Sequence, residues 1–311
     1  YEMVWRNARG DFKPSGEPAG GYPAFARAWS TPVDHARLAV RQHAPVVTWL
    51  GHVTVLLQVG GLNILMDPTL AAFAGPYGRF GAPRRVPAPL HARELPPIDI
   101  VLISHNHYDH LCDATISDLL AAGQRPHFYV PLGLKAWFDA RQIADVHEMD
   151  WWEHADVAGS GLRLHFTPSQ HWSRRTPWDT NASLWGGFLV EWTRPTAAPW
   201  RYLFPGDTGY SADFKAIRQR VGAIDFLALP IGAYLPRDFM KKMHINPAES
   251  VQMLLDLDAK QCMGVHWGTF MLTQEAFDQP PHDLADALRH HGLAPNKVWL
   301  LRHGETREIG L

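Results

Sequence analysis

Short apolar runs, separated by glycine, proline and polar turns, recur along most of the chain. Two β-rich runs at 46–50 and 53–59 precede Gly60-Gly61, and a third run follows at 62–66, a pattern that predicts a β-hairpin. Beyond residue 98, strand-like and helix-like segments alternate. This alternation predicts strands at 98–103, 127–130, 162–166, 184–192, 202–204, 225–229, 261–265 and 298–301, and helices at 114–122, 133–140, 213–221 and 281–291. Such alternation is typical of an α/β fold.

The sequence also predicts how the chain is divided. Residues 1–40 are predicted to form an extended N-terminal arm, because the stretch 13–23 is too rich in proline and glycine for a helix or a central strand. Residues 41–311 show no internal repeat and no linker, so we expect one domain there. Residues 74–97 are rich in proline, glycine and arginine and predict a long loop, and long ordered loops are often functional.

The composition narrows the class of protein. Hydrophobic residues make up 46% of the 311 residues, which excludes a disordered chain. The net charge of -2 argues against non-specific electrostatic binding of nucleic acid. The two cysteines, Cys112 and Cys262, cannot form a disulfide framework, and no apolar run reaches the roughly 18 residues of a membrane-spanning helix. The unusual count is 18 histidines, because histidine is the commonest metal ligand.

Four potential metal ligands follow directly after the predicted strand 98–103. They are His105, His107, Asp109 and His110. Alternate residues of an extended segment share a face, so His105 and His107 can point at one metal ion, and a turn can aim the other two at a second. The alternative is a polar loop with solvated histidines, but that would crowd imidazoles at a buried strand end without a purpose.

Three later strand ends each add one potential ligand. His171 follows the strand 162–166, Asp207 follows the strand 202–204, and His266 follows the strand 261–265. Taken alone, His171 or His266 reads equally well as an ordinary surface histidine, and Asp207 reads more readily as a turn residue. Together with the histidine cluster, they predict a site assembled from strand ends.

The order and spacing of these seven residues resemble the metallo-β-lactamase superfamily. Further segments are similar to N-acyl-phosphatidylethanolamine-hydrolysing phospholipase D and its bacterial relatives. They are 49–55, 67–68, 95–98, 105–111, 170–172, 206–210, 244–247 and 266–270.

The resemblance implies an α/β fold of the αββα sandwich type, with two facing mixed β-sheets flanked by helices and a metal site along one edge. It also implies two zinc ions, the first held by His105, His107 and His171, the second by Asp109, His110 and His266, with Asp207 bridging them. Imidazole and carboxylate groups suit zinc on chemical grounds as well. Iron and manganese take the same ligand types, so the identity of the metal stays open.

Two residues are predicted to act in catalysis. Two metal ions about 3.5–4 Å apart can share one hydroxide, so we expect a metal-bridging hydroxide to attack a phosphorus or carbonyl centre, with Asp109 orienting it. His244 lies two residues before Asn246, the predicted N-cap of a helix, and a helix N-terminus favours anions. The matching histidine belongs to the active site of the resembling phospholipases; a solvated loop histidine is the alternative.

Three aromatic residues are predicted to contact the substrate: Tyr108, Trp172 and Tyr210. His52 follows the strand 46–50 and is predicted to be a structural, hydrogen-bonded histidine rather than a ligand.

The leading functional prediction is a binuclear phosphodiesterase of phospholipase D type that cuts N-acyl-phosphatidylethanolamine-like lipids. The alternatives are a lactonase or another ester or thioester hydrolase of the same superfamily and, less favoured, a di-iron redox protein. We expect a small-molecule or phospholipid substrate and no nucleic-acid partner, and leave peripheral membrane contact and a homodimer open. The expected location is the cytoplasm or the membrane periphery; because the chain starts at Tyr1, a removed leader peptide is also left open.

Overall fold

Two facing seven-stranded β-sheets form the centre of the computed structural model, which describes residues 16–194 and 196–311. The first sheet has the strand order β16-β1-β2-β3-β6-β7-β8 and the second β15-β14-β13-β12-β11-β10-β9. Both sheets are mixed, because each joins antiparallel hairpins to a set of parallel strands. The strands of the first sheet are β1 (Val46–Gly51), β2 (Thr54–Val59), β3 (Leu62–Met66), β6 (Ile100–Leu102), β7 (His127–Pro131), β8 (Val146–Met149) and β16 (Thr306–Glu308). Those of the second are β9 (His154–Val157), β10 (Leu162–Thr167), β11 (Gly187–Arg194), β12 (Ala197–Phe204), β13 (Phe226–Pro230), β14 (Gln261–Val265) and β15 (Val298–Trp299).

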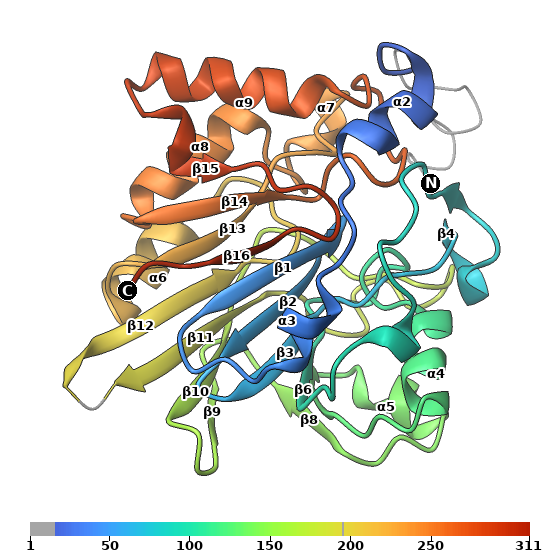
Figure 1. Cartoon of the computed structure of the whole chain (residues 1–311), viewed down its shortest axis with the longest axis vertical. Coiled ribbons are helices and arrows are strands. Elements are labelled where there is room, and N and C mark those ends of the chain that lie inside the picture. The colour runs from blue at the N-terminus through green and yellow to red at the C-terminus, as the bar shows by residue number, and fades with distance from the viewer. Residues whose placement is uncertain (1–15, 195) are drawn as a thin grey trace.

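Helices flank the two sheets (Figure 1). Helices α4 (Asp113–Ala121) and α5 (Lys135–Asp139) lie beside the first sheet, and α6 (Asp213–Val221), α8 (Pro247–Asp256) and α9 (Gln279–His290) lie beside the second. The shorter elements are α2 (Gly21–Ala28), α3 (His35–Ala39), α7 (Arg237–Met240), the single turns η1 (Pro76–Gly78), η2 (Ala92–Glu94) and η3 (Pro295–Lys297), and a two-stranded ribbon of β4 (Phe73–Ala74) and β5 (Ala82–Pro83). The predicted αββα sandwich is therefore confirmed.

Strand β2 shows why its sequence is apolar without interruption. Val55 and Leu57 pack into the core between the sheets, whereas Leu56 packs into the core under α4 and α5. Successive side chains of a strand point to opposite faces, so a strand covered on both faces needs apolar residues at every position. The hairpin from β2 to β3 turns at Gly60-Gly61 as predicted, with both glycines at positive φ.

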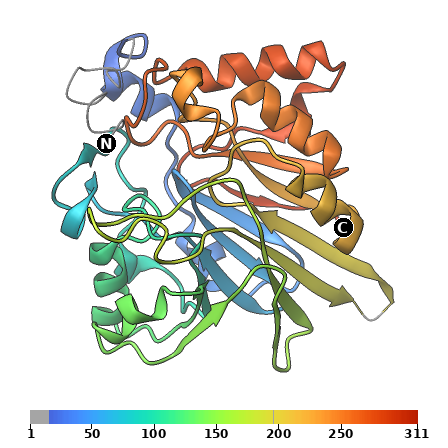
Figure 2. The same cartoon turned by 180° about the vertical axis from the view of Figure 1, so that it is seen from behind.

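The prediction of an extended N-terminal arm is wrong for its described part. Helices α2 and α3 occupy residues 21–28 and 35–39, and residues 1–15 lie outside the described residues. Pro23 is compatible with α2 because it lies in the first turn, where backbone N–H groups have no acceptor within the helix. Phe25 is buried and packs edge-on against Phe277, so tertiary contact outweighs the poor local helix propensity. Figure 2 shows α2, in blue, beside the red-orange segment that leads to α9.

The segment 74–97 also differs in part from a plain loop, because it contains the β4–β5 ribbon and the turns η1 and η2.

Within residues 16–194 and 196–311, no helix combines the length and the apolar character needed to cross a membrane.

Candidate metal centre

The centre lies where four strands end. The segment 104–112 connects β6 to α4 and carries the histidine cluster, while His171, Asp207 and His266 follow the ends of β10, β12 and β14. Gly206 permits the turn that presents Asp207: its φ is +64°, and an added Cβ would lie 2.6 Å from the carbonyl oxygen of Gly186. The structure thus brings all seven predicted ligand residues together, and each comes from the element that the sequence predicted.

His105, His107 and His171 form the first group of this centre. Nε2 of His105 lies 2.8 Å from Nδ1 of His107, and Nε2 of His171 lies 3.3 Å from the same Nδ1. One ring nitrogen of each histidine can therefore face one metal ion.

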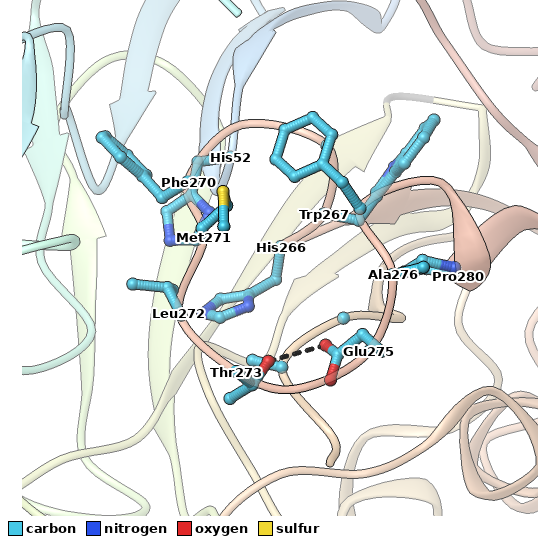
Figure 3. A pocket seen from close by; sticks show the side chains of 14 residues that line it. His52, His266, Trp267, Phe270, Met271, Leu272, Thr273, Glu275, Ala276 and Pro280 are labelled. Atoms are coloured by element: carbon cyan, nitrogen blue, oxygen red, sulfur yellow. Dashed lines mark hydrogen bonds between the residues drawn. The ribbon is translucent and has the colours of Figure 1, made fainter. Parts of the chain in front are cut away.

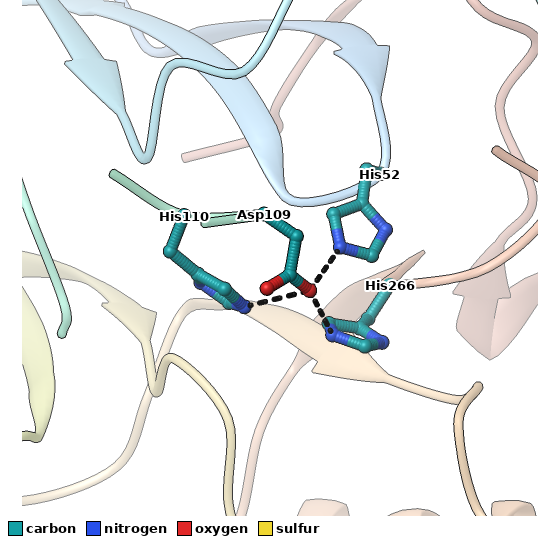
Figure 4. A group of neighbouring side chains, drawn as sticks. All are labelled: His52, Asp109, His110 and His266. Atoms are coloured by element: carbon teal, nitrogen blue, oxygen red, sulfur yellow. Dashed lines mark hydrogen bonds and ion pairs between the residues drawn. The ribbon is translucent and has the colours of Figure 1, made fainter. Parts of the chain in front are cut away.

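Asp109, His110 and His266 form the second group, and His52, which Figure 4 shows with them, offers a fourth potential ligand atom, all four atoms lying within 4.8 Å of one another. Oδ2 of Asp109 lies 3.6 Å from Nε2 of His110 and also 3.6 Å from Nε2 of His266. The same oxygen lies 3.0 Å from Nε2 of His52, so the residue predicted to be structural contacts the site directly.

Asp207 lies between the two groups. Its Oδ2 is 3.1 Å from His110 Nε2, and 3.8 Å from His171 Nε2 in the first group. Its Oδ1 is 3.1 Å from His266 Nε2, yet neither of these two atoms has a hydrogen-bond partner among the described residues. Buried polar atoms without a partner are costly, and a metal ion would satisfy both.

Outer contacts fix the direction of three imidazole rings. Nδ1 of His105 contacts the Ser104 hydroxyl at 2.9 Å, and Nδ1 of His171 contacts the Met243 carbonyl oxygen at 2.9 Å. Nδ1 of His110 contacts Asp67 Oδ2 at 2.7 Å. In each ring the opposite nitrogen, Nε2, therefore faces the centre, as is usual for metal-binding histidines. The sequence reasoning missed Asp67 and Ser104; the signal available was that Asp67-Pro68 ends one strand and Ser104 follows another.

The electrostatics of the site favour a metal ion. Burial lowers the pKa of His107 to about 3 and that of His171 to about 4, so their rings are neutral and keep a free lone pair. Burial alone would raise the pKa of Asp109 and Asp207, but neighbouring histidines, His110 first, hold both pKa values well below their usual range. In the second group, burial alone would lower the histidine pKa values, but Asp207 and Asp109 raise the pKa of His266 to about 9 and hold that of His110 well above its usual range. The first group therefore offers neutral imidazoles beside ionised carboxylates, which are donors that zinc, iron or manganese take, whereas the rings of the second group must release a proton when a metal ion binds.

A cavity of about 430 Å³ opens onto this centre. Its lining combines histidines and carboxylates, two arginines, and aromatic and apolar side chains: His107, Asp109, Asp207, His244 and His266; Arg174 and Arg175; Tyr108, Trp172, Phe239, Met240, Met243 and Leu272. A smaller cavity of about 30 Å³, enough for about one water molecule, lies beside His52 and His266 and is shown in Figure 3.

The predicted catalytic and substrate residues occupy different positions around the large cavity. His244 lines it, with Nδ1 3.9 Å from Asp207 Oδ2, and Asn246 caps α8 as predicted. Tyr108 and Trp172 also line it, and Trp172 packs edge-on against His107. Tyr210 departs from the prediction: it is not among the lining residues, because its hydroxyl donates to Asp256 and its ring packs against Phe214.

The fold and the centre define a metal-dependent hydrolase. The chain belongs to the β-lactamase superfamily, because the model described as "Beta-lactamase superfamily domain" matches residues 62–267. The chain is 37% identical over 251 residues to "N-acyl-phosphatidylethanolamine-hydrolyzing phospholipase D 1" of Caenorhabditis elegans, with 78% of this chain and 69% of that protein covered. It is 39% identical over 242 residues to the mitochondrial "N-acyl-phosphatidylethanolamine-hydrolyzing phospholipase D" of Saccharomyces cerevisiae, with 76% of this chain covered. The chain spans only half the length of this yeast relative.

A solved structure supports the fold independently. Igni18, a metallo hydrolase from the archaeon Ignicoccus hospitalis, superposes with a TM-score of 0.62 over 86% of this chain and 99% of its own. Its sequence is only 19% identical, so this likeness concerns the fold.

Proposed function

We propose that the chain is a binuclear metal-dependent phosphodiesterase of phospholipase D type that acts on N-acyl-phosphatidylethanolamine-like lipids. The observation that carries the proposal is the cavity of about 430 Å³, whose lining joins apolar side chains to the histidines and carboxylates of the metal centre. The names of the nematode and yeast relatives support the same substrate class.

Two metal ions, zinc in our proposal, fit the arrangement of the donors. His105, His107 and His171 would hold the first, Asp109, His110 and His266 the second, and Asp207 would bridge them. When bound, the ions supply positive charge that polarises a phosphoryl oxygen and activates water near neutral pH.

The walls of the cavity suit the acyl part of a lipid. Phe239, Met240, Met243 and Leu272 line one stretch of it, and the flexible methionine side chains can adapt to a hydrocarbon chain. Lys241 and Lys242 are exposed directly beside the two methionines. We propose that this pair contacts the anionic surface of a membrane while the lipid enters.

Two polar residues are proposed to bind the phosphodiester group. Arg174 lines the cavity, and its Nε donates to the carbonyl of Thr176; it forms no ion pair within the described part of the chain. Arg175, by contrast, is bound to Asp113. We propose that Arg174 binds a phosphate oxygen and that His244, which also lines the cavity, hydrogen-bonds the phosphate or the departing oxygen.

The proposed reaction is a hydrolysis at phosphorus. A water oxygen forms the new P–O bond, the bond from phosphorus to the N-acylethanolamine oxygen breaks, and that oxygen takes up a proton. The products are phosphatidic acid and an N-acylethanolamine.

A substrate panel on the metal-analysed protein tests this proposal. It compares N-acyl phospholipids, simple phosphodiesters, lactones and thioesters, and we expect the N-acyl phospholipids to be turned over with the highest kcat/KM. Turnover of lactones without turnover of phosphodiesters would replace the proposal by the lactonase alternative.

A further inference from the structure

We infer that His52 is a positioning residue of the metal centre. Its ring orients the carboxylate of Asp109, and its backbone carbonyl anchors His266, so that it holds the second ligand group together. This inference rests on the proposed two-metal site.

The ring of His52 reaches Asp109 from the turn after β1, as Figure 4 shows. Its side chain is 2% exposed, and Nε2 lies 3.0 Å from Asp109 Oδ2. An ionised carboxylate oxygen can only accept, so Nε2–H is the donor, while Nδ1 has no partner among the described residues. The hydrogen bond therefore fixes one oxygen of Asp109 and limits rotation of its carboxylate.

The backbone of His52 hydrogen-bonds the turn after β1 to the loop after β14. Its carbonyl oxygen accepts hydrogen bonds from the N–H of His266 at 3.0 Å and from Trp49 Nε1 at 2.9 Å. Its own N–H donates to Thr269 Oγ1 at 2.7 Å. The rings of His52 and His266 also pack together, with centroids 4.2 Å apart, beside the small cavity (Figure 3).

Both histidines adopt a backbone conformation that is unfavourable for their residue type. The φ angle is +54° at His52 and +61° at His266, in the left-handed region, which costs a residue other than glycine on the order of 1–2 kcal/mol. Asparagine or glycine would occupy such a turn at lower cost. The contacts of the imidazole, rather than the needs of the turn, therefore account for a histidine at position 52.

These contacts favour one ligand group over the other. Within the described residues, His52 contacts Asp109 and His266 and packs near His110, and no hydrogen bond or ring contact joins it to the first group, His105, His107 and His171. Loss of the hydrogen bond from His52 to Asp109 should therefore lower the affinity for the second metal ion more than that for the first.

A matched pair of variants tests the inference. The positive φ at position 52 destabilises leucine and glutamine by a similar free energy. Of the two variants, only His52→Gln keeps an N–H donor that can reach Asp109. Zinc content is measured by elemental analysis of the full chain equilibrated in buffers of stepped free zinc, and the cobalt-substituted protein gives the ligand environment by its visible spectrum. We expect two ions in the unaltered protein, a second ion bound about 10- to 100-fold more weakly in His52→Leu, and recovery of most of that affinity in His52→Gln.

His303→Gln is the control, because His303 is buried in the same wall and shares Thr269 with His52 but does not contact Asp109.

Two ions bound by His52→Leu with undiminished affinity would overturn the inference and leave the proposed function standing. A loss in His303→Gln equal to that in His52→Leu would also overturn it, since general loosening of the wall would then be the cause. A loss in His52→Gln as large as in His52→Leu would make the imidazole itself a ligand. A single ion in the unaltered protein would instead refute the two-metal proposal, whatever the variants do.

Discussion

Nδ1 of His110 lies 2.7 Å from Oδ2 of Asp67, and this contact joins the end of β3 to the metal-binding segment after β6. Asp67 is fully buried, and its other oxygen accepts the backbone N–H of Ser104 at 2.7 Å. One carboxylate therefore fixes both the ring of a proposed ligand and the backbone on which the histidine cluster begins. Such outer contacts set the tautomer and the orientation of metal-binding histidines.

Replacement of Asp67 by asparagine should weaken metal binding at the second group by about 10- to 100-fold, because a neutral amide is a poorer acceptor for the ring N–H of His110. Asparagine keeps the size and tolerates the φ of +39° at this position. Competition with a chelator, followed by metal analysis, measures the affinity. Asp258→Asn is the control, since Asp258 also has a positive φ but its side chain is exposed. Equal affinities in the two variants would contradict the prediction.

The ligand residues could be predicted from the sequence because each stands next to a recognisable strand end. The contact between Asp67 and His110 could not, because it depends on how β3 and β6 pair. These strands are parallel, with Met66 opposite Leu102, and this register sets Asp67 beside Ser104. A local hydrophobic pattern shows that a strand is buried, but it does not show which sequence-distant strand pairs with it or which residues lie opposite each other.

Several edge strands and helix α2 were not predicted from the sequence, again because contacts between distant segments determine them. Strands β8, β9 and β16 lie at or next to sheet edges and are short and partly exposed, so their hydrophobic pattern is weak. Helix α2 was missed because its glycine and proline content argues against a helix, whereas the contacts of Phe25 with distant aromatic rings stabilise it.

Replacement of Arg174 by glutamine should raise the KM for an anionic phosphodiester by about tenfold, because a hydrogen bond to a charged group contributes on the order of 1.5 kcal/mol. Steady-state kinetics with a phosphodiester and with an uncharged ester separate a charge effect from general damage to the cavity. Arg125→Gln is the control: within residues 16–194 and 196–311, Arg125 also bonds only backbone carbonyls, those of Leu120 and Gln124, but it is not among the residues that line the cavity. A KM raised equally for both substrates would argue against a phosphate contact.

Replacement of Phe25 by alanine should lower the free energy of unfolding by about 3 kcal/mol, because it removes a buried ring from the core. The ring centroids of Trp267 and Phe277 lie 6.3 and 4.9 Å from that of Phe25, so the loss would loosen the wall that carries His266. Urea unfolding measures the change. Phe80→Ala, at a ring that is 64% exposed, should change stability by no more than about 0.5 kcal/mol. A similar small change in Phe25→Ala would mean that α2 contributes little to the fold.

His303 should make the stability of the protein depend on pH. The ring is fully buried, donates from Nδ1 to the carbonyl of Trp29, and accepts at Nε2 from Thr269 Oγ1. Burial lowers its pKa to about 3, opposed by the hydrogen bond to the Trp29 carbonyl and assisted by the nearby Arg84 guanidinium. The same histidine titrates near pH 6.5 in the unfolded chain, so between these values the unfolded chain binds one more proton than the folded one.

It follows that the stabilisation by neutral His303 is complete above about pH 6.5 and is lost as the pH falls from there towards 3, at about 1.4 kcal/mol per pH unit. Urea unfolding of the unaltered protein and of His303→Gln at pH 5.0, 5.5, 6.0 and 6.5, with the same metal content, measures this slope. Other histidines titrate in both proteins and cancel in the difference. We expect the slope of the unfolding free energy against pH to be smaller in His303→Gln by about that amount, and equal slopes would show that His303 is protonated in the folded state.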